Sequence, residues 1–500
     1  MVDSSIIRSI VNNRTSLSFI LPGLILTGTL LAVLVIDLLV PYLYKRYGLR
    51  MVPIAGICLA LYATIQLGSQ PSVQAGLSLG NHLLKLDPWA IFWHGLLLGM
   101  TLGVLLTTSP KPSLADTAVY LVMLLGTLLG AYWLVMAQHW LIIYLSLTLM
   151  TLASAVLICT SWQALGTVAS LQYLLYSAVG AAMMLWGMSY LYGSTGTLSL
   201  AASSFVYDGQ LLPKVVLLAG FLLALSGILI TLGALPFHYW LADVYQGAPM
   251  TVVAYLATVP KLAAVALMVR LYKQLIQQLG GVGSQLQGCI ALIAILTIAI
   301  GHIAALMQTQ PRRVLAYGSI AQGGLLLAGI GACTSHCAII AYYGTVYGIM
   351  SLASWIGLKV FRRLASSEHL HDYAGLGRQF PVLGLCVVIA LLSLVGLPPT
   401  AGFTGKLFIF GALWEAAQMT KSPLLATLFI LGLLGSIVSL YYYLQLPYML
   451  FCKPMQRPAL PMPVPWAEQF ILLVLTAMLL GLFFSAGPSM AVLQSWHLLP

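Results

Sequence analysis

The sequence predicts an all-α protein that crosses a membrane about 14 times. Of its 500 residues, 61% are hydrophobic and only 6% are charged, and apolar runs recur with short polar gaps between them. A soluble domain carries about 25% charged residues. Because a helix of about 20 apolar residues spans a bilayer, this composition indicates one polytopic membrane domain rather than a series of soluble ones.

Each apolar run matches one bilayer crossing. The twelfth run is too long for one helix and contains Pro398-Pro399, so we expect one span in two halves. No small-residue cleavage pattern follows the first run, so we expect no cleaved signal peptide. The predicted spans lie near residues 16–43, 51–69, 89–108, 117–137, 140–161, 165–192, 213–235, 248–272, 285–308, 312–331, 337–360, 381–417, 422–446 and 467–487.

The lysines and arginines predict the orientation of the chain. Twelve of them lie in or beside loops that follow odd-numbered spans, and seven lie on the other side. Because basic loops favour the inner side of a membrane, we expect the odd loops inside and both termini outside. The formal net charge of +11 fits such loops and does not require a nucleic-acid partner.

Two stretches combine helix breakers with ionisable groups at membrane depth. Residues 396–406 contain Pro398, Pro399 and Lys406. Residues 231–261 contain a longer set of prolines and ionisable residues. Both kinds of group are costly inside a bilayer, so their coincidence indicates a transport path. One such stretch in each half also indicates an internal repeat. The longer set comprises Pro236, His238, Asp243, Pro249, Pro260 and Lys261.

Lys261 and Lys406 lie well inside predicted spans and have no acidic neighbour in sequence. Inserting a lysine at the centre of a membrane helix costs about 2.5–3.5 kcal/mol. A buried lysine can take up and release a proton near neutral pH. The alternative is a lysine that reaches the membrane surface or forms a structural ion pair. We expect Lys261 and Lys406 to act in a proton path because a proline break lies beside each of these lysines.

The histidines and acids are weaker candidates. His238 can pass a proton or can be a hydrogen-bonded core histidine. His302 is a second candidate, for which packing or a water-lined cavity is the alternative. Asp243 is expected to cap or anchor its loop, and it lies close enough in sequence to tune Lys261. The acids at predicted loops and helix ends are expected to be solvated, and these are Asp87, Asp116, Asp208, Glu368, Asp372 and Glu468.

The seven cysteines lie mostly in apolar runs, where a thiol behaves as a small hydrophobe. Cys333, His336 and Cys337 could suggest a metal site, but no second ligand pair accompanies them, so we expect packing and no metal. The sequence has no phosphate-binding glycine loop, no cysteine set spaced for an iron–sulfur cluster and no dinucleotide fingerprint. The chain therefore cannot carry out redox chemistry alone.

A set of motifs closely resembles the antiporter-like subunits of respiratory complex I. The pair Tyr245-Gln246 and the absence of a long C-terminal lateral helix resemble subunit N (subunit 2) rather than its L and M relatives. The resemblance covers roughly residues 115–450. Its motifs are PFHYWLADVYQGAP, the lysine Lys261, RRVLAYGSIAQ, HDYAGLGRQFP and GLPPTAGFTGKL.

The resemblance implies fourteen helices with two inverted five-helix repeats, each containing one broken helix. The repeats would occupy residues 117–272 and 285–446, between N-terminal helices in 1–116 and a C-terminal helix in 447–500. It also implies site residues. Lys261 would match the central lysine of the eighth helix, Lys406 the lysine of the broken twelfth helix, and His238 the histidine of the PFH segment.

Three charged positions of the family are replaced in this chain. A threonine or glutamine can hold water by hydrogen bonding but cannot store a proton, so pumping by the first repeat is in question. The replacements are Thr148 for a fifth-helix glutamate, Gln172 for a sixth-helix lysine and Thr231 for a seventh-helix lysine.

The resemblance implies a membrane-arm subunit that contributes to proton translocation in a complex I-type NAD(P)H or ferredoxin:quinone oxidoreductase. FMN, iron–sulfur clusters and quinone would belong to partner subunits, and the neighbours would be another antiporter-like chain and small membrane subunits. The membrane would be a bacterial-type inner (cytoplasmic) membrane, a thylakoid membrane or an organellar inner membrane. Two alternatives stay open: a non-pumping structural subunit, and a component of an Mrp-type cation/proton antiporter, against which the shortage of buried carboxylates counts.

Overall fold

The computed structural model describes most of the 500-residue chain. The described residues are 4–39, 42–74, 76–80, 82–108, 114–160, 163–200, 214–279, 281–332, 337–365, 367–455 and 464–496.

The described chain is almost entirely helical, because a backbone in a bilayer must satisfy its own hydrogen bonds. The two short strands form an antiparallel hairpin that pairs Leu77 with Leu86. In order, the elements are α1 (Ser4–Leu39), α2 (Tyr42–Gly68), α3 (Pro71–Gln74), β1 (Leu77–Leu79), β2 (Leu84–Leu86), α4 (Pro88–Thr107), α5 (Leu114–Met136), α6 (Trp140–Cys159), α7 (Ala164–Thr195), α9 (Lys214–Leu232), α10 (Tyr239–Gly247), α11 (Met250–Leu256), α12 (Val259–Leu279), α13 (Gly281–Leu306), α14 (Pro311–Gly331), α15 (Cys337–Ala365), η1 (Leu370–Tyr373), α16 (Leu376–Gln379), α17 (Pro381–Val395), α18 (Ala401–Thr420), α19 (Pro423–Phe451), α20 (Trp466–Phe484) and α21 (Ala486–Ser495).

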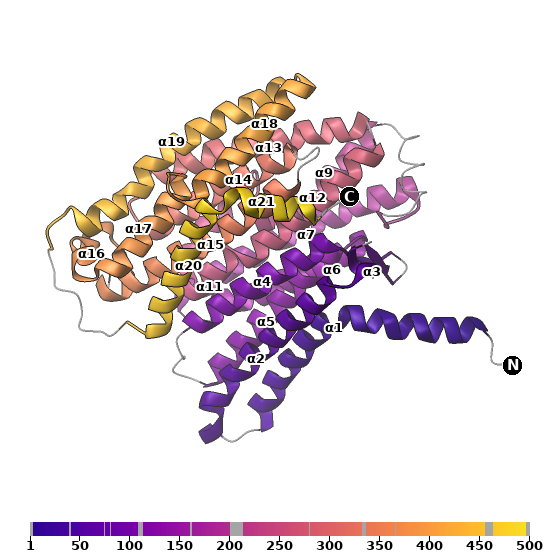
Figure 1. Ribbon diagram of the computed structural model, residues 1–500, viewed down its shortest axis with the longest axis horizontal. Coiled ribbons are helices and arrows are strands. Elements are labelled where there is room, and N and C mark those ends of the chain that lie inside the picture. Colours follow the sequence, from indigo (N-terminus) through magenta and orange to yellow (C-terminus); the bar gives the residue numbers. More distant parts are fainter. Residues whose placement is uncertain are drawn as a thin grey trace.

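The predicted polytopic all-α fold is confirmed. Within the described residues, 13 spans are long and apolar enough to cross a membrane. The consecutive helices α17 and α18 supply one more crossing in two halves, as the proline pair in the twelfth run predicts. In Figure 1 the helices of the first half lie on one side of the body and those of the second half on the other, while the start of α1 projects away.

Two helix breaks, one in each half, share a local pattern. Between α9 and α10, Gly233 has a left-handed φ of 70° and the Leu235-Pro236 peptide is cis. Between α17 and α18, Gly396 has a left-handed φ of 88° and the Pro398-Pro399 peptide is cis. Both breaks therefore consist of a glycine that ends one half-helix and a proline shortly after it.

Helix α14 lies between the two halves. Nearly all of its residues are buried, and it packs against α10 and α12 of the first half and against α13, α15, α18 and α19 of the second. Small residues allow these close approaches. A Cβ placed on Gly323 would lie 3.3 Å from the carbonyl oxygen of Leu232, at the end of α9. Helix α14 thereby meets the first break directly.

Candidate functional site: two buried amines joined by helix α14

Lys261 lies directly after a break in the eighth span. Pro260 has no backbone N–H, so the helix cannot run through it unchanged, and α11 ends at Leu256 before α12 begins at Val259. The hydroxyl of Tyr347 donates to the carbonyl of Ala257, a group in this break, at 3.0 Å. The proline signal in the sequence therefore predicted the local structure beside the lysine.

The amine of Lys261 is buried among neutral partners. The side chain is 1% exposed, and its Nζ donates to Ser319 Oγ at 2.9 Å and to the Ser319 carbonyl at 3.2 Å. It also lies 5.9 Å from the ring centroid of Tyr245, where the aromatic quadrupole attracts a cation. The amine faces α14 and does not reach the protein surface.

Lys406 lies in α18, the second half of the broken twelfth span, and its amine reaches the C-terminal end of α17, the first half. Helix α17 stops at Gly396, so its last carbonyls have no helical donor. The Nζ of Lys406 donates to the carbonyls of Val395 at 2.7 Å and Leu394 at 3.0 Å, and to Ser436 Oγ at 3.4 Å. The partial negative charge of a helix C-terminus favours a cation there. The helix break therefore provides the carbonyl oxygens that bind the amine.

Helix α14 joins the two amines through one face. Ser319 and Gln322 are three residues apart, so their side chains lie on the same side of the helix. Ser319 holds Lys261, and the Nε2 of Gln322 donates at 2.9 Å to the Leu394 carbonyl that also accepts from Lys406. The hydroxyl of Tyr343 donates to the Oε1 of Gln322. Two polar side chains on one face of α14 thus bond to Lys261 and to a carbonyl that also holds Lys406.

Among the residues that the structure describes, neither amine has an acidic partner. Throughout the described part of the chain, no carboxylate forms an ion pair with Lys261 or Lys406. Asp243 pairs instead with Arg313 at 3.2 Å and its side chain is 50% exposed. Asp243 therefore ties its segment to the start of α14, and its ion pair is not with Lys261.

The two candidate histidines occupy different surroundings. His238 is buried at the start of α10, where its ring lies 4.2 Å from that of Tyr239. No recorded hydrogen bond or ion pair joins His238 to either lysine among the described residues. His302 lines a small cavity together with Gln322 and Lys406, and its Nδ1 lies 2.9 Å from the Tyr442 hydroxyl. The weaker sequence candidate is therefore the one that shares a cavity with a site lysine.

The three positions at which the resemblance implies replaced charges do not line this cavity. Thr148 and Gln172 are half-buried on α6 and α7, and Thr148 Oγ1 donates to the carbonyl of Leu145 in its own helix. Thr231 is buried near the end of α9 and donates to the carbonyl of Gly227. The hydroxyls of both threonines therefore bond to their own helix backbones.

Two of the acids expected to be solvated are buried, so that expectation was wrong for them. Asp87 caps α4 and forms a two-point pair with Arg270, at 2.8 Å and 3.0 Å. Glu468 begins α20 and pairs with Lys359 at 2.8 Å and Arg363 at 2.7 Å. A buried carboxylate keeps its charge only with such partners.

One partial signal for these pairs is present in the sequence. Asp87 followed by Pro88 marks the start of a helix, but its partner Arg270 lies 183 residues away. Asp208 lies outside the described residues, as do Cys333 and His336 of the rejected metal motif, and Cys337 is buried at the start of α15.

Comparisons with known proteins agree with this architecture. A family profile described as NADH:quinone oxidoreductase/Mrp antiporter, TM, matches residues 137–435. The chain is 33% identical over 457 residues to the NAD(P)H-quinone oxidoreductase subunit 2 of Synechococcus sp. (strain JA-3-3Ab), a match that covers 90% of this chain and 84% of that one. It is 30% identical over 497 residues to the NADH-quinone oxidoreductase subunit N of Chlorobium chlorochromatii (strain CaD3), covering 96% and 95%.

A solved structure matches the fold over nearly the whole chain. A chain of the respiratory complex I of Thermus thermophilus, solved with bound aureothin, superposes with a TM-score of 0.79 and 27% identity, covering 94% of this chain and 99% of that one. The profile covers more than half of the chain, and the relatives extend over nearly all of it. The chain belongs to the NADH:quinone oxidoreductase/Mrp antiporter family of membrane proteins, and its relatives are the N or 2 subunits of quinone oxidoreductases.

Proposed function

We propose that this chain is a membrane-arm subunit of a complex I-type quinone oxidoreductase and that it moves protons between Lys261 and Lys406. The observation that carries the proposal is the pair of buried amines, both without a carboxylate and both bonded to groups on or beside α14. Because each amine has only neutral partners, its proton can be gained or lost without breaking an ion pair.

The partners of this chain supply the redox chemistry in the proposal. The relatives are named as subunits of NAD(P)H- or NADH-quinone oxidoreductases. The electron donor, NAD(P)H or ferredoxin, would therefore act with FMN, iron–sulfur clusters and quinone in neighbouring subunits. Another antiporter-like chain and small membrane subunits would flank this one, in an inner or thylakoid membrane with both termini on the outer side.

The test replaces each lysine in the assembled complex. Lys261→Met and Lys406→Met keep a long apolar side chain but cannot carry a proton, so proton translocation per electron in proteoliposomes should fall about tenfold or more. Lys421→Met changes an exposed lysine just after α18 and should leave translocation unchanged. Assembly should be normal in all three variants.

Two alternative functions predict different results in these experiments. The half-buried neutral residues at 148 and 172 favour a structural subunit as the second candidate, because they cannot store protons. That candidate predicts full translocation in both methionine variants. A chain that purifies without quinone-reductase partners and whose transport requires sodium or potassium would instead be a cation/proton antiporter component.

A further inference from the structure

His302 lies between two cavities in the second half of the molecule. Its ring lines a polar cavity that is also lined by Gln322, Lys406 and Ser436. Its Nδ1 is bonded to the Tyr442 hydroxyl at 2.9 Å, and Tyr442 lines a second cavity. Tyr442 therefore lines the second cavity with its side chain and contacts His302 through its hydroxyl, so it lies between the two spaces.

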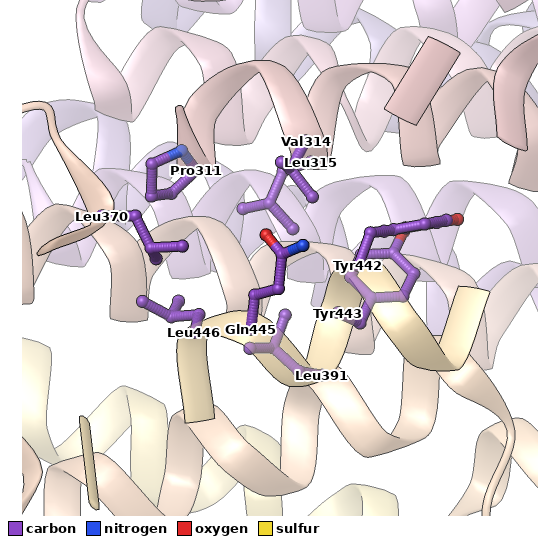
Figure 2. A pocket seen from close by; sticks show the side chains of 9 residues that line it. All are labelled: Pro311, Val314, Leu315, Leu370, Leu391, Tyr442, Tyr443, Gln445 and Leu446. Atoms are coloured by element: carbon purple, nitrogen blue, oxygen red, sulfur yellow. The ribbon is translucent and has the colours of Figure 1, made fainter. Parts of the chain in front are cut away.

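The second cavity reaches toward the loops at one end of the bundle. Pro311 at the start of α14 and Leu370 of η1 line one side of it, and Tyr442 and Tyr443 line the opposite side (Figure 2). The amide of Gln445 projects into the middle of this space (Figure 2). Leu370 and Gln445 are half-buried, so the cavity extends toward the surface of the bundle.

The position of His302 depends on a glycine. A Cβ placed on Gly435 of α19 would lie 2.6 Å from both Nε2 and Cδ2 of the ring. No side chain fits there unless the imidazole moves. Gly435 therefore lets the ring lie against α19, with its Nδ1 toward Tyr442 and its edge beside the polar cavity.

We propose that Tyr442 and His302 pass protons between Lys406 and the aqueous phase at the end of the bundle that holds Pro311 and Leu370. This inference rests on the proposed function, because it requires Lys406 to exchange protons. A hydronium ion in the outer cavity gives a proton to the Tyr442 hydroxyl and becomes neutral water, and the hydroxyl gives its own proton to His302 Nδ1. His302 releases the proton on Nε2 to water in the polar cavity, and the Lys406 amine takes it up. A change of tautomer then restores the imidazole, and no group is consumed.

Other membrane-spanning helices of the described chain differ from α13 in their buried ionisable groups. His94 is also buried inside a span, but its Nε2 bonds the backbone carbonyl of Tyr132 at 3.0 Å and its ring stacks on that tyrosine at 3.7 Å. Helices α6 and α7 contain no Asp, Glu, Lys, Arg or His at all. The bond from His302 to a tyrosine hydroxyl thus differs from the backbone bond of His94.

The first test uses variants that keep the hydrogen bond or the shape. His302→Gln can still bond Tyr442 but cannot titrate, and Tyr442→Phe removes only the hydroxyl. In proteoliposomes that contain the assembled complex, both should lower proton translocation per electron at least threefold. Tyr441→Phe, which changes the adjacent exposed tyrosine, should have no effect. A His302→Gln complex that translocates normally would overturn the proposal, because a structural histidine is replaced by glutamine without loss of transport.

The second test measures access to the outer cavity. In a chain whose seven native cysteines are replaced by serine, Gln445→Cys should react with a membrane-impermeant thiol reagent, and the reaction should reduce translocation as strongly as His302→Gln does. Tyr441→Cys serves as the control outside the cavity and should keep full translocation after the same treatment. Absence of labelling at 445 in the assembled complex would contradict the access route.

The two proposals fail in different ways. If Lys406→Met loses translocation while His302→Gln and Tyr442→Phe keep it, the function stands and this route is wrong. If Lys406→Met keeps full translocation, the proposed function itself is wrong.

Discussion

Each buried lysine in this chain is held by backbone and hydroxyl oxygens that a helix break or a neighbouring helix makes available. Lys406 is the clearer case, because the carbonyls of Leu394 and Val395 lack helical donors only where α17 ends. Gly396 makes that ending possible in two ways. It adopts a left-handed φ of 88°, and its missing side chain leaves room for the lysine.

Gly396→Ala should therefore disturb Lys406 directly. The new Cβ would lie 2.8 Å from Lys406 Cδ, and the left-handed backbone costs a non-glycine residue about 1–2 kcal/mol. We expect a lower thermal unfolding midpoint of the purified complex and reduced proton translocation. Gly411→Ala, in α18 with open space at its Cβ, should leave both unchanged. Equal midpoints for the two variants would show that the close packing at Gly396 is not required.

At the scale of elements, helix α14 determines how the two halves are connected. Its Ser319 and Gln322 bond groups that belong to the eighth span and to the broken twelfth span. It also packs closely against α13, where a Cβ on Gly301 would lie 2.7 Å from the backbone nitrogen of Ala321. Since Ala321 adjoins Gln322, the α13–α14 contact fixes the polar face of α14 in place.

Gly301→Ala should separate α13 from α14. Alanine forms helices better than glycine by about 1 kcal/mol, so helix propensity alone would stabilise the variant. A loss of stability would therefore come from overfilling the core, which costs about 1–3 kcal/mol. Gly288→Ala on the same helix is the control, because its Cβ would make only an ordinary 3.8 Å contact with Leu424. We expect thermal unfolding measurements to show destabilisation at 301 and no change, or a slight gain, at 288. The opposite order would contradict close packing of α13 against α14.

For the whole molecule, the sequence predicted what depends on local physics. The spans follow from apolar length, the breaks follow from Pro236, Pro260 and the pair Pro398-Pro399, and the two lysines stand out because no acid is near them in sequence. These features need no knowledge of which helices are neighbours. The division into two five-helix repeats stays a prediction, supported by the similar breaks at 233–236 and 396–399.

What the sequence could not predict depends on packing between distant segments. Ser319 lies 58 residues from Lys261, and an internal serine in an apolar helix gives no signal of its partner. The same holds for the buried pair of Asp87 with Arg270, which looks like two solvated charges at helix ends until the helices are packed. The role proposed for Tyr442 likewise depends on its position between two cavities.

We propose that one hydrated polar route joins Lys261 to Lys406 along α14. The most direct measurement is a cryo-electron microscopy map of the assembled complex at a resolution that shows ordered water. We expect water density in the cavity lined by His302, Gln322 and Lys406, and a hydrogen-bonded connection from that water along Gln322 and Ser319 to the Lys261 amine. A dry cavity filled by rearranged apolar side chains, with the two amines isolated from each other, would contradict it.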